Sequence, residues 1–313
     1  MVPLIADLLI PGILWLNARS MTDKFSQEAA QQRIYREFAI LVSRDENTID
    51  LAQAALQIAK VAYPDLDPVP SLSYLDALAR RVMQLHAQIA SNTTEQSNPL
   101  ELIGSLNHVL FEDEHFHGNE SDYYDPDNSF LNKVLEEHTG LPITLSLLYM
   151  EVGKRAGIPL EGMGFPYHFM VRYSWPEGRI YIDPFARGQL LNEAECLERI
   201  QQRTHHRGGL HQRWLEPVTP RQMLVRILNN LKSVYIRHGD FPHALAISDL
   251  LLLLLPDATV EQRDRGLLHL ELKHYGRAMQ DLQTYLERNP KASDRYEIRN
   301  HIKQIRQTIA QLN

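Results

Sequence analysis

Three positions in the middle of the chain have the layout of an acyl-transfer site. A helix is expected to begin near Pro142, His168 lies in a later strand-like stretch, and Asp183 ends the next such stretch. A thiolate at a helix N-terminus, a histidine that reaches it and a carboxylate that orients the histidine are the parts of a Cys-His-Asp site. The chain offers the histidine and the carboxylate.

The thiol of such a site is missing. The only cysteine, Cys196, follows all three positions, and Pro142 has no reactive group. Thr144 and Ser146 lie in the first turns of the expected helix and are candidate replacements, although hydroxyls in an apolar helix usually bond to backbone carbonyls. A hydroxyl is also a much weaker nucleophile than a thiolate unless a base activates it. A scaffold, a site with another nucleophile and a chance pattern all remain open.

The histidine and the carboxylate are expected on paired strands. The stretches 167–173 and 179–183 read as two strands joined by a turn. If Tyr173 pairs with Gly178, the histidine faces the aspartate directly, at a cross-strand distance of about 5 Å. A His–Asp pair of this kind is more often structural than catalytic.

The elements around these residues are mainly helical. Helices are expected over 24–63, 73–89, 100–110, 128–138 and 142–156, with a break at the proline-containing stretch 64–70. Helices followed by a hairpin indicate an α+β core with an antiparallel sheet.

An acidic loop over 111–128 holds seven Asp and Glu residues and no Lys or Arg. His115 and His117 with these carboxylates could form a metal site. The run 125–127 lacks the glycine and the distal glutamate of a calcium loop, however. Acidic residues also favour the N-terminal end of a helix. We therefore favour a solvated loop that leads into a helix, and we predict neither a metal nor a cofactor.

The last third of the chain repeats. Three residue pairs recur at a spacing of 34 residues: Phe241 and Tyr275, Ala244 and Ala278, and Pro256 and Pro290. This is the tetratricopeptide period. The second unit departs from the first in having Lys273 where the first has Gly239, and residues 294–313 suit a capping helix. Because two repeats are few for a free-standing solenoid, we expect them to dock on the core.

Composition and charge indicate a globular chain of more than one part. Of 313 residues, 44% are hydrophobic and 23% charged, and the net charge is −7. Residues 221–313 hold 14 basic and 10 acidic residues, a net of +4, so residues 1–220 hold 18 and 29, a net of −11. This balance argues against nucleic-acid binding. A single cysteine excludes an intramolecular disulfide framework and a multi-cysteine metal site, and fits a reducing compartment.

The N-terminus is apolar over residues 1–15, but Asp7, Pro11 and Gly12 interrupt it and no basic residue precedes it. It therefore fits neither a secretory signal nor a membrane span of about 20 residues. Met21 is a second candidate for the translation start.

Several motifs together resemble the bacterial SirB family. They are Tyr123–Glu136, Gly140–Tyr149, Gly157–Gly162, Pro166–Tyr173 and Ile182–Phe185. The resemblance spans roughly residues 35–290. It implies a transglutaminase-like domain, of the papain-like group, followed by tetratricopeptide repeats.

In active relatives of that fold, a cysteine opens the helix, a histidine stands on the next strand and an aspartate on the following one. His168 and Asp183 match the second and third positions, whereas the first falls at or near Pro142. The resemblance therefore implies a retained fold whose cleft binds rather than reacts.

We expect five parts and an α+β class with an all-α repeat unit. The parts are an apolar tail (1–23), a helical N-terminal region (24–110), a transglutaminase-like core (111–200), a linker (201–220) and repeats with a capping helix (221–313). The favoured function is a non-catalytic, cytoplasmic, bacterial protein-interaction or regulatory protein. It would bind a protein or peptide through its repeats, and neither nucleic acid nor membrane.

Two alternatives remain open. One is a hydrolase or acyl transferase that uses Thr144 or Ser146 with His168 as base and Asp183 as orienting carboxylate. The other is a metal-binding regulator built on the acidic loop.

Overall fold

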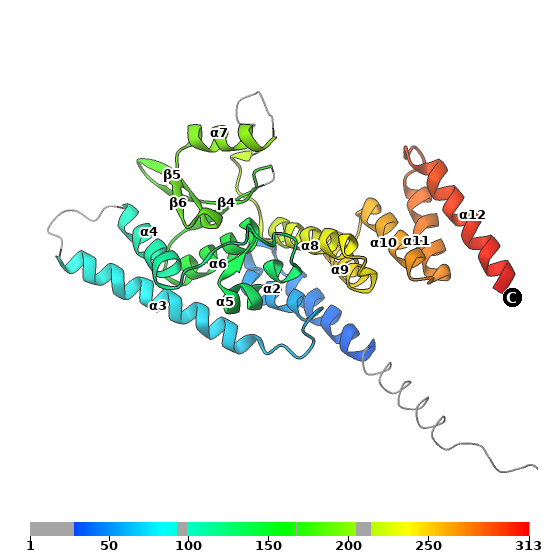
Figure 1. The fold of residues 1–313 in the computed structure, drawn as a ribbon, viewed down its shortest axis with the longest axis horizontal. Helices are drawn as coiled ribbons and strands as arrows, with labels where there is room; N and C mark the ends of the chain where they lie inside the picture. The colour runs from blue at the N-terminus through cyan, green and yellow to red at the C-terminus, as the bar shows by residue number, and fades with distance from the viewer. Residues whose placement is uncertain (1–27, 93–98, 167, 205–213, 313) are drawn as a thin grey trace, which may run out of the picture.

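The computed structural model describes residues 28–92, 99–166, 168–204 and 214–312 (Figure 1). The expected tail 1–23 and residues 205–213 of the expected linker 201–220 lie outside these residues. The helices before the sheet, in chain order, are 28–42, α2 (Leu51–Ala59), α3 (Pro68–Asn92), α4 (Pro99–Asn107), α5 (Leu131–Glu137) and α6 (Pro142–Arg155).

Two of the expected element limits in this region were wrong. Helix α3 begins at Pro68, so Pro70 lies in its first turn rather than in a break. Proline is tolerated there because first-turn amides have no helical acceptor. Helix α4 continues as a π-helix (His108–Asp113), so the acidic loop begins later than residue 111. Phe111 is buried and stacks on Tyr149 at 5.9 Å between ring centroids, which holds this extra turn on the core.

A four-stranded antiparallel sheet follows α6. Its order is β3 (Leu160–Met163), β4 (Met170–Trp175), β5 (Gly178–Asp183) and β6 (Gln189–Leu191). Helix α6 packs against β3 and β4, and α7 (Glu193–Thr204) packs against β5 and β6. Figure 1 shows the sheet lying between these two helices. The α+β prediction is confirmed.

Side chains of alternate strand residues lie on opposite faces of this sheet. Val171 and Ile182 join the main core, whereas Met170 and Tyr181 join a second cluster with Cys196 of α7. This follows from the alternation of side chains along a strand.

The register of the β4–β5 hairpin differs from the expected one by two residues. Trp175 pairs with Gly178 across a two-residue turn, and Tyr173 pairs with Ile180 rather than with Gly178. The strand continues past its expected end because the rings of Tyr173 and Trp175 stack at 5.8 Å. Gly178 permits this, since a Cβ there would lie 2.9 Å from the Trp175 ring. A shift of two residues leaves every side chain on its expected face.

The described residues 214–312 form five further helices: α8 (Pro220–Arg237), α9 (Phe241–Leu254), α10 (Thr259–Glu271), α11 (Tyr275–Arg288) and α12 (Arg295–Leu312). The 34-residue period corresponds to equivalent places in α9 and α11, where Ala244 and Ala278 are both fully buried. Gly239 and Lys273 both adopt left-handed backbone, with φ of +71° and +59°. Lysine therefore occupies a helix-ending position that favours glycine.

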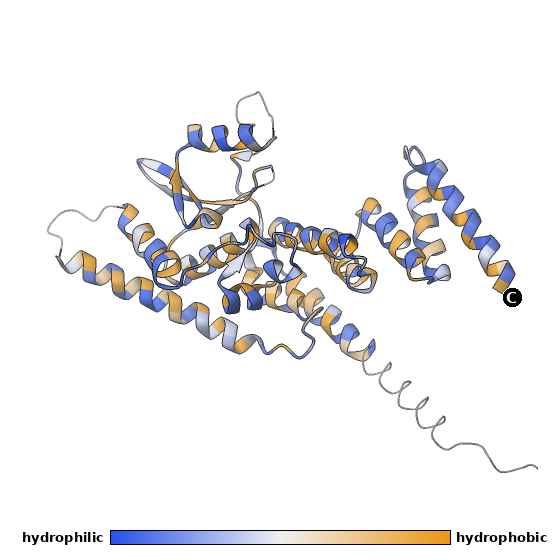
Figure 2. Cartoon of the chain, viewed as in Figure 1, coloured by the Kyte–Doolittle hydropathy of each residue, from blue (hydrophilic) through white to orange (hydrophobic). Residues whose placement is uncertain are grey.

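The first helix pair shares the main hydrophobic core with the α+β part. Residues of α8 and α9, among them Leu224, Leu228 and Ile247, belong to the cluster that contains α2, α6 and the sheet. Helices α11 and α12 form a cluster of their own around Leu282 and Ile302. Figure 2 shows the same contrast, with hydrophobic residues prominent on α8 and α9 and hydrophilic ones on α12.

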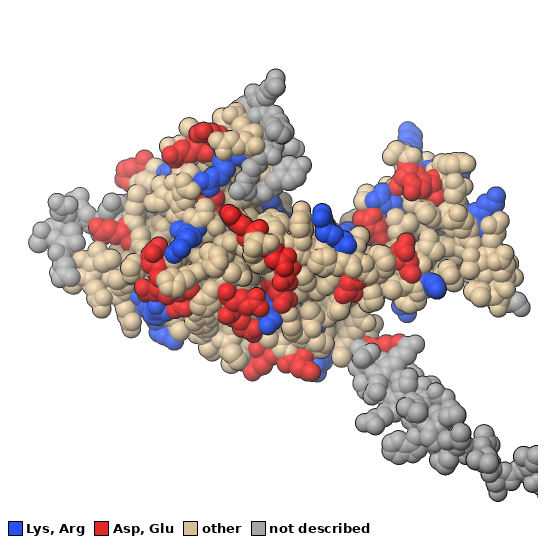
Figure 3. Space-filling model, in the orientation of Figure 1, with Lys and Arg blue, Asp and Glu red and all other residues tan. Residues whose placement is uncertain are grey.

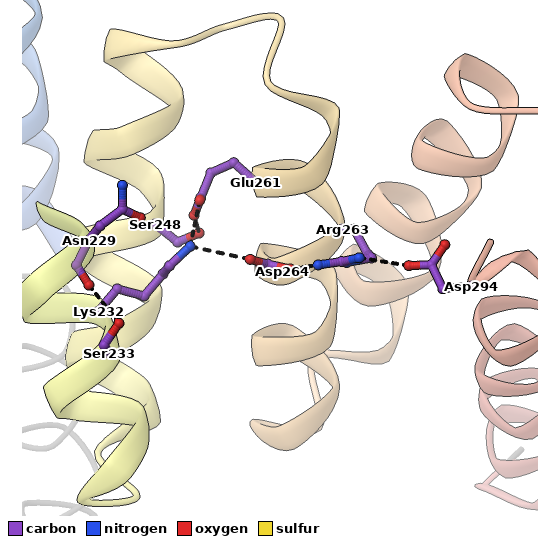
Figure 4. A network of polar contacts seen from close by, with 8 residues as sticks. All are labelled: Asn229, Lys232, Ser233, Ser248, Glu261, Arg263, Asp264 and Asp294. Carbon is purple, nitrogen blue, oxygen red and sulfur yellow. Dashed lines mark hydrogen bonds and ion pairs between the residues drawn. The ribbon is translucent and has the colours of Figure 1, made fainter. Parts of the chain in front are cut away.

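A network of buried and partly buried charges joins the pair α8–α9 to the following pair α10–α11 (Figure 4). Lys232 of α8 contacts Glu261 and Asp264 of α10 at 2.5 and 3.3 Å, and Ser248 of α9 donates to Glu261. Arg263 extends the network through Asp294, just before α12, at 2.7 Å. None of the described helices combines the length and apolarity that crossing a bilayer requires.

Candidate functional site

His168 and Asp183 lie together, as expected, and both are buried. His168 lies in the loop before β4, and Asp183 is the last residue of β5 and the N-cap of a 3₁₀ helix, η4 (Pro184–Ala186). The distance from His168 Nε2 to Asp183 Oδ2 is 2.7 Å, and the two residues are 2% and 1% exposed. Because His168 precedes the paired part of β4, the two residues meet diagonally and not as direct cross-strand partners.

Asp183 is ionised in this environment. Burial by itself raises the pKa of the carboxyl, but the hydrogen bond and charge of His168 and the charge of Arg199 outweigh it and lower the pKa. Arg199 of α7 contacts Oδ2, and the amides of Phe185 and Ala186 donate to Oδ1 at 3.2 and 3.3 Å. An ionised carboxylate only accepts hydrogen bonds, so Nε2 of His168 carries a proton.

The loop that carries His168 is held by helix α8. Arg226 of α8 donates to the backbone oxygen of His168 at 2.7 Å and to that of Phe165 at 3.2 Å. Its guanidinium also lies 5.3 Å from the centre of the Phe169 ring. Burial lowers the pKa of Arg226.

Sequence reasoning missed both Arg199 and Arg226. For Arg226, the only signal in the sequence was a basic residue flanked by the apolar positions of α8. That signal does not indicate which carbonyl oxygens the arginine contacts.

Pro142 is the first residue of α6, where an acyl-transfer enzyme of this layout would place its nucleophile. The Thr144 hydroxyl near this tip is already used. It donates to the backbone oxygen of Asn128 at 2.7 Å and accepts from the amide of Leu141 at 3.0 Å. Thr144 thereby ties the start of α6 to the 3₁₀ helix η3 (Pro126–Ser129).

Ser146, the second candidate nucleophile, is fully buried. Its Oγ has no hydrogen-bond partner, and within the described ranges neither Ser146 nor Thr144 forms a hydrogen bond with His168. Among the described residues, two of the four candidates, His168 and Asp183, are therefore hydrogen-bonded to each other, and neither hydroxyl is hydrogen-bonded to this pair.

Cys196 is not a hidden replacement for the thiol. It is fully buried on α7, with Sγ 3.9 Å from Sδ of Met170. Burial raises the pKa of this thiol to about 12, so the reactive thiolate form is suppressed near neutral pH.

A cavity of about 520 Å³ lies next to the His–Asp pair. Its lining comprises residues 117–121 and 185–187. Phe185 lies edge-on to the His168 ring, with centroids 6.2 Å apart, and therefore contributes to both the cavity and the pair. Gly118 allows Phe185 to approach, because a Cβ at Gly118 would lie 2.5 Å from the ring.

The acidic loop makes hydrogen bonds within itself and to Tyr63. Asp125 accepts from the amide of Asp127, and Asp127 accepts from the hydroxyl of Tyr63 at 2.5 Å. Nδ1 of His117 lies 2.9 Å from the backbone oxygen of His115. Over the described parts of the chain, no cluster of three or more His, Cys, Asp or Glu side chains is arranged to hold a metal ion.

Comparison with known proteins supports two family matches. The profile of the transglutaminase-like superfamily matches residues 72–229, and a tetratricopeptide repeat profile matches residues 231–303. No solved structure gives a significant match.

Similar proteins are found in bacteria and in mammals. A UPF0162 protein of Xylella fastidiosa is 36% identical over 270 residues, which cover 84% of this chain and 92% of that protein. A UPF0162 protein of Vibrio cholerae is 27% identical over 255 residues, covering 80% and 90%. F-box only protein 21 of Homo sapiens is 33% identical over 197 residues, covering 57% of this chain and 30% of that protein.

Proposed function

Because the chain belongs to the transglutaminase-like superfamily and to the UPF0162 proteins, and also carries tetratricopeptide repeats, we propose that it is a protein-interaction and regulatory protein with a non-catalytic cleft. Both kinds of domain support an interaction role. The narrower SirB assignment, a cytoplasmic location, and the absence of nucleic-acid and membrane binding are further parts of this proposal.

The observation that carries the proposal is the tip of α6. Pro142 offers no attacking atom, and the hydroxyl of Thr144 is committed to backbone groups at 2.7 and 3.0 Å. Ser146 is fully buried, so a substrate carbonyl has no route to its Oγ. Nucleophilic catalysis requires a nucleophile within hydrogen-bond reach of its base, and the lack of a hydrogen bond from either hydroxyl to His168 among the described residues supports the proposal.

In this proposal the His168–Asp183 pair has a structural role. The pair, together with Arg199, joins the loop before β4, the end of β5 and helix α7. Arg226 joins the same loop to the repeats. The His168–Asp183 pair would thus stabilise the part of the α+β core that Arg226 of helix α8 contacts.

A covalent probe tests the non-catalytic part. We expect purified full-length protein to form no adduct with a fluorophosphonate at Thr144 or Ser146, as measured by intact-mass and peptide mass spectrometry. An adduct at either residue that disappears in the His168→Ala variant would instead establish the hydrolase or acyl-transferase alternative.

A cross-linking experiment in bacterial cells tests the interaction part. Full-length tagged protein should capture a partner whose yield saturates and falls when untagged protein is co-expressed in excess. The Ser146→Ala variant should capture it equally well, because the proposal gives this hydroxyl no role. Failure to capture any competable partner, or loss of capture in Ser146→Ala, would contradict the proposal.

A further inference from the structure

The outer face of the last two helices forms a groove. It lies between α11 and α12 and has a volume of about 690 Å³. Figure 1 places these helices at the far end of the molecule from the sheet. The lining residues are Gln283, Leu286, Glu287, Pro290, Arg295, Arg299, Ile302, Lys303 and Arg306.

One wall of this groove is a row of basic side chains. Arg295, Arg299, Lys303 and Arg306 are spaced by four, four and three residues, which puts them on one face of α12. The lining holds only one carboxylate, that of Glu287. It therefore holds four cations against one anion, in a chain whose overall charge is −7.

Three of these cations have no acidic partner among the described residues. In the described ranges, Arg299, Lys303 and Arg306 form no ion pair with a carboxylate, and all three are exposed. The inner cations of the repeats differ, because Lys232 and Arg263 are both paired with acidic residues (Figure 4). Basic residues on α12 are thus available to an external anion.

The rest of the groove is suited to apolar side chains. Leu286 and Pro290 contribute apolar lining from the α11 side, and Ile302, which is 7% exposed, contributes it from α12. Outside the groove lining, Tyr296 of the same helix has a 79% exposed ring, three residues before Arg299. An exposed aromatic ring beside cations and an apolar floor is typical of protein-binding surfaces.

We infer that the α11–α12 groove binds an acidic peptide segment of a partner protein, one that carries apolar side chains beside its carboxylates. This inference rests on the proposed interaction function and names its partner chemistry. Carboxylates of the segment would pair with Arg299, Lys303 and Arg306, and its apolar side chains would cover Leu286 and Ile302. Charge complementarity would steer the encounter and set the orientation of the segment.

Nucleic acid fits this surface less well. A long polyanion would extend beyond the groove over a molecule whose first 220 residues carry a net charge of −11. Figure 3 shows acidic residues gathered on the visible face of the α+β part. A short acidic peptide avoids that repulsion, and phosphate groups would leave the apolar floor uncovered.

The test uses full-length protein and a fluorescein-labelled 12-residue peptide of alternating Glu and Leu, followed by fluorescence anisotropy. We expect saturable binding that weakens as NaCl is raised from about 50 to about 200 mM. The triple variant Arg299→Glu, Lys303→Glu, Arg306→Glu should bind at least about tenfold more weakly, because three favourable pairs become repulsive.

Matched controls separate the groove from net charge. Arg33, Arg36 and Arg80 are exposed and form no ion pair within the described residues. Their triple change to Glu alters the net charge equally and should leave binding within about twofold. If the groove variant is misfolded by circular dichroism, the milder change of the same three residues to Gln replaces it.

Several outcomes would overturn the inference. They are undiminished binding by the groove variant, equal binding of a Gln–Leu peptide, tighter binding of a DNA duplex, and no saturable binding at all. A self-association that the groove variant abolishes in sedimentation velocity would instead identify a second copy of the chain as the occupant. If the partner captured by cross-linking is retained by the groove variant, this inference fails while the interaction function stands.

Discussion

At the residue scale, the candidate site is a buried ion pair beside a helix tip without a nucleophile. His168 and Asp183 retain a hydrogen bond at 2.7 Å, and the guanidinium of Arg199 contacts the same carboxylate. Removing one partner of a buried pair leaves an uncompensated charge, so this arrangement matters for stability even where no reaction occurs.

Removing the two hydroxyls of α6, those of Ser146 and Thr144, should change the stability of the protein in different directions. Ser146→Ala deletes a buried hydroxyl without a partner, so we expect unchanged or slightly higher stability, by up to about 1 kcal/mol. Thr144→Val removes the hydroxyl's bonds to the amide of Leu141 and the oxygen of Asn128, which keep only their mutual bond of 3.3 Å, and should cost about 1 kcal/mol. Urea unfolding monitored by circular dichroism measures both. A large loss of stability in Ser146→Ala would show that its hydroxyl has a partner after all.

The Asp183 carboxylate should make the free energy of unfolding depend on pH in the acidic range. Its pKa is lower in the folded than in the unfolded chain, so its contribution is present above the ordinary carboxyl pKa and is lost as pH falls through the folded-state value. Asp183→Asn should therefore lower the free energy of unfolding by about 3 kcal/mol at pH 7 and by less near pH 3.

Urea titrations of the parent chain and the Asp183→Asn variant at both pH values make this comparison. An equal difference at the two pH values would contradict the ionised, paired state of Asp183.

At the scale of elements, the repeats combine a regular period with local departures from it. Ala244 and Ala278 are equivalent buried positions, and Gly239 and Lys273 are equivalent left-handed positions. The sequence showed the 34-residue period, but only the backbone angles show that Lys273 adopts the left-handed conformation that usually favours glycine.

Lys273→Gly should stabilise the second repeat. A non-glycine residue in the left-handed region costs about 1 kcal/mol, and the variant removes that cost. The matched change Gly239→Ala should destabilise the first repeat by a similar amount. Thermal unfolding of both variants provides the test, and a destabilised Lys273→Gly would show that the lysine side chain contributes more than its backbone costs.

The buried network between α8 and α10 should couple the two helix pairs. Lys232→Met leaves Glu261, which is 8% exposed, without its cation, and should destabilise the protein by about 3 kcal/mol. Adding Glu261→Gln should recover part of this loss. A double-mutant cycle measured by urea unfolding quantifies the coupling, and additive effects of the two changes would show that the pair does not interact.

At the scale of the whole molecule, the first helix pair belongs to the main core and the last helices do not. Helix α8 contributes Leu224, Ile227 and Leu228 to the same cluster as α2 and α6, and Arg226 holds the loop of His168. Helices α11 and α12 pack around a separate cluster, which leaves their outer groove available to a partner.

A fragment of residues 221–313 should therefore be poorly folded. It would expose the apolar face of α8 that the α+β part covers, and two repeats bury too little surface alone. Circular dichroism should show reduced helicity and a broad melt, with the full-length chain as control. A cooperative melt of the fragment would mean that the repeats fold independently.

The sequence by itself determined the elements and their class. Apolar periodicity predicted the helices and the hairpin, the 34-residue spacing predicted the repeats, and the missing cysteine marked the altered site. These signals are local, because helix and strand periods are written in neighbouring residues. Side chains alternate along a strand with a period of two, so the predicted face of each hairpin residue was right although the predicted register was off by two residues.

Only the tertiary structure decided how distant segments meet. Arg199 and Arg226 reach the site from α7 and α8, 16 residues from Asp183 and 58 from His168, and no local pattern encodes these contacts. The hydrogen bonding of Thr144 and Ser146 could not be predicted from the sequence either, because it depends on which backbone groups the fold brings within hydrogen-bond distance of each hydroxyl. Such contacts depend on packing between elements, whereas the elements themselves depend on the order of residues along the chain.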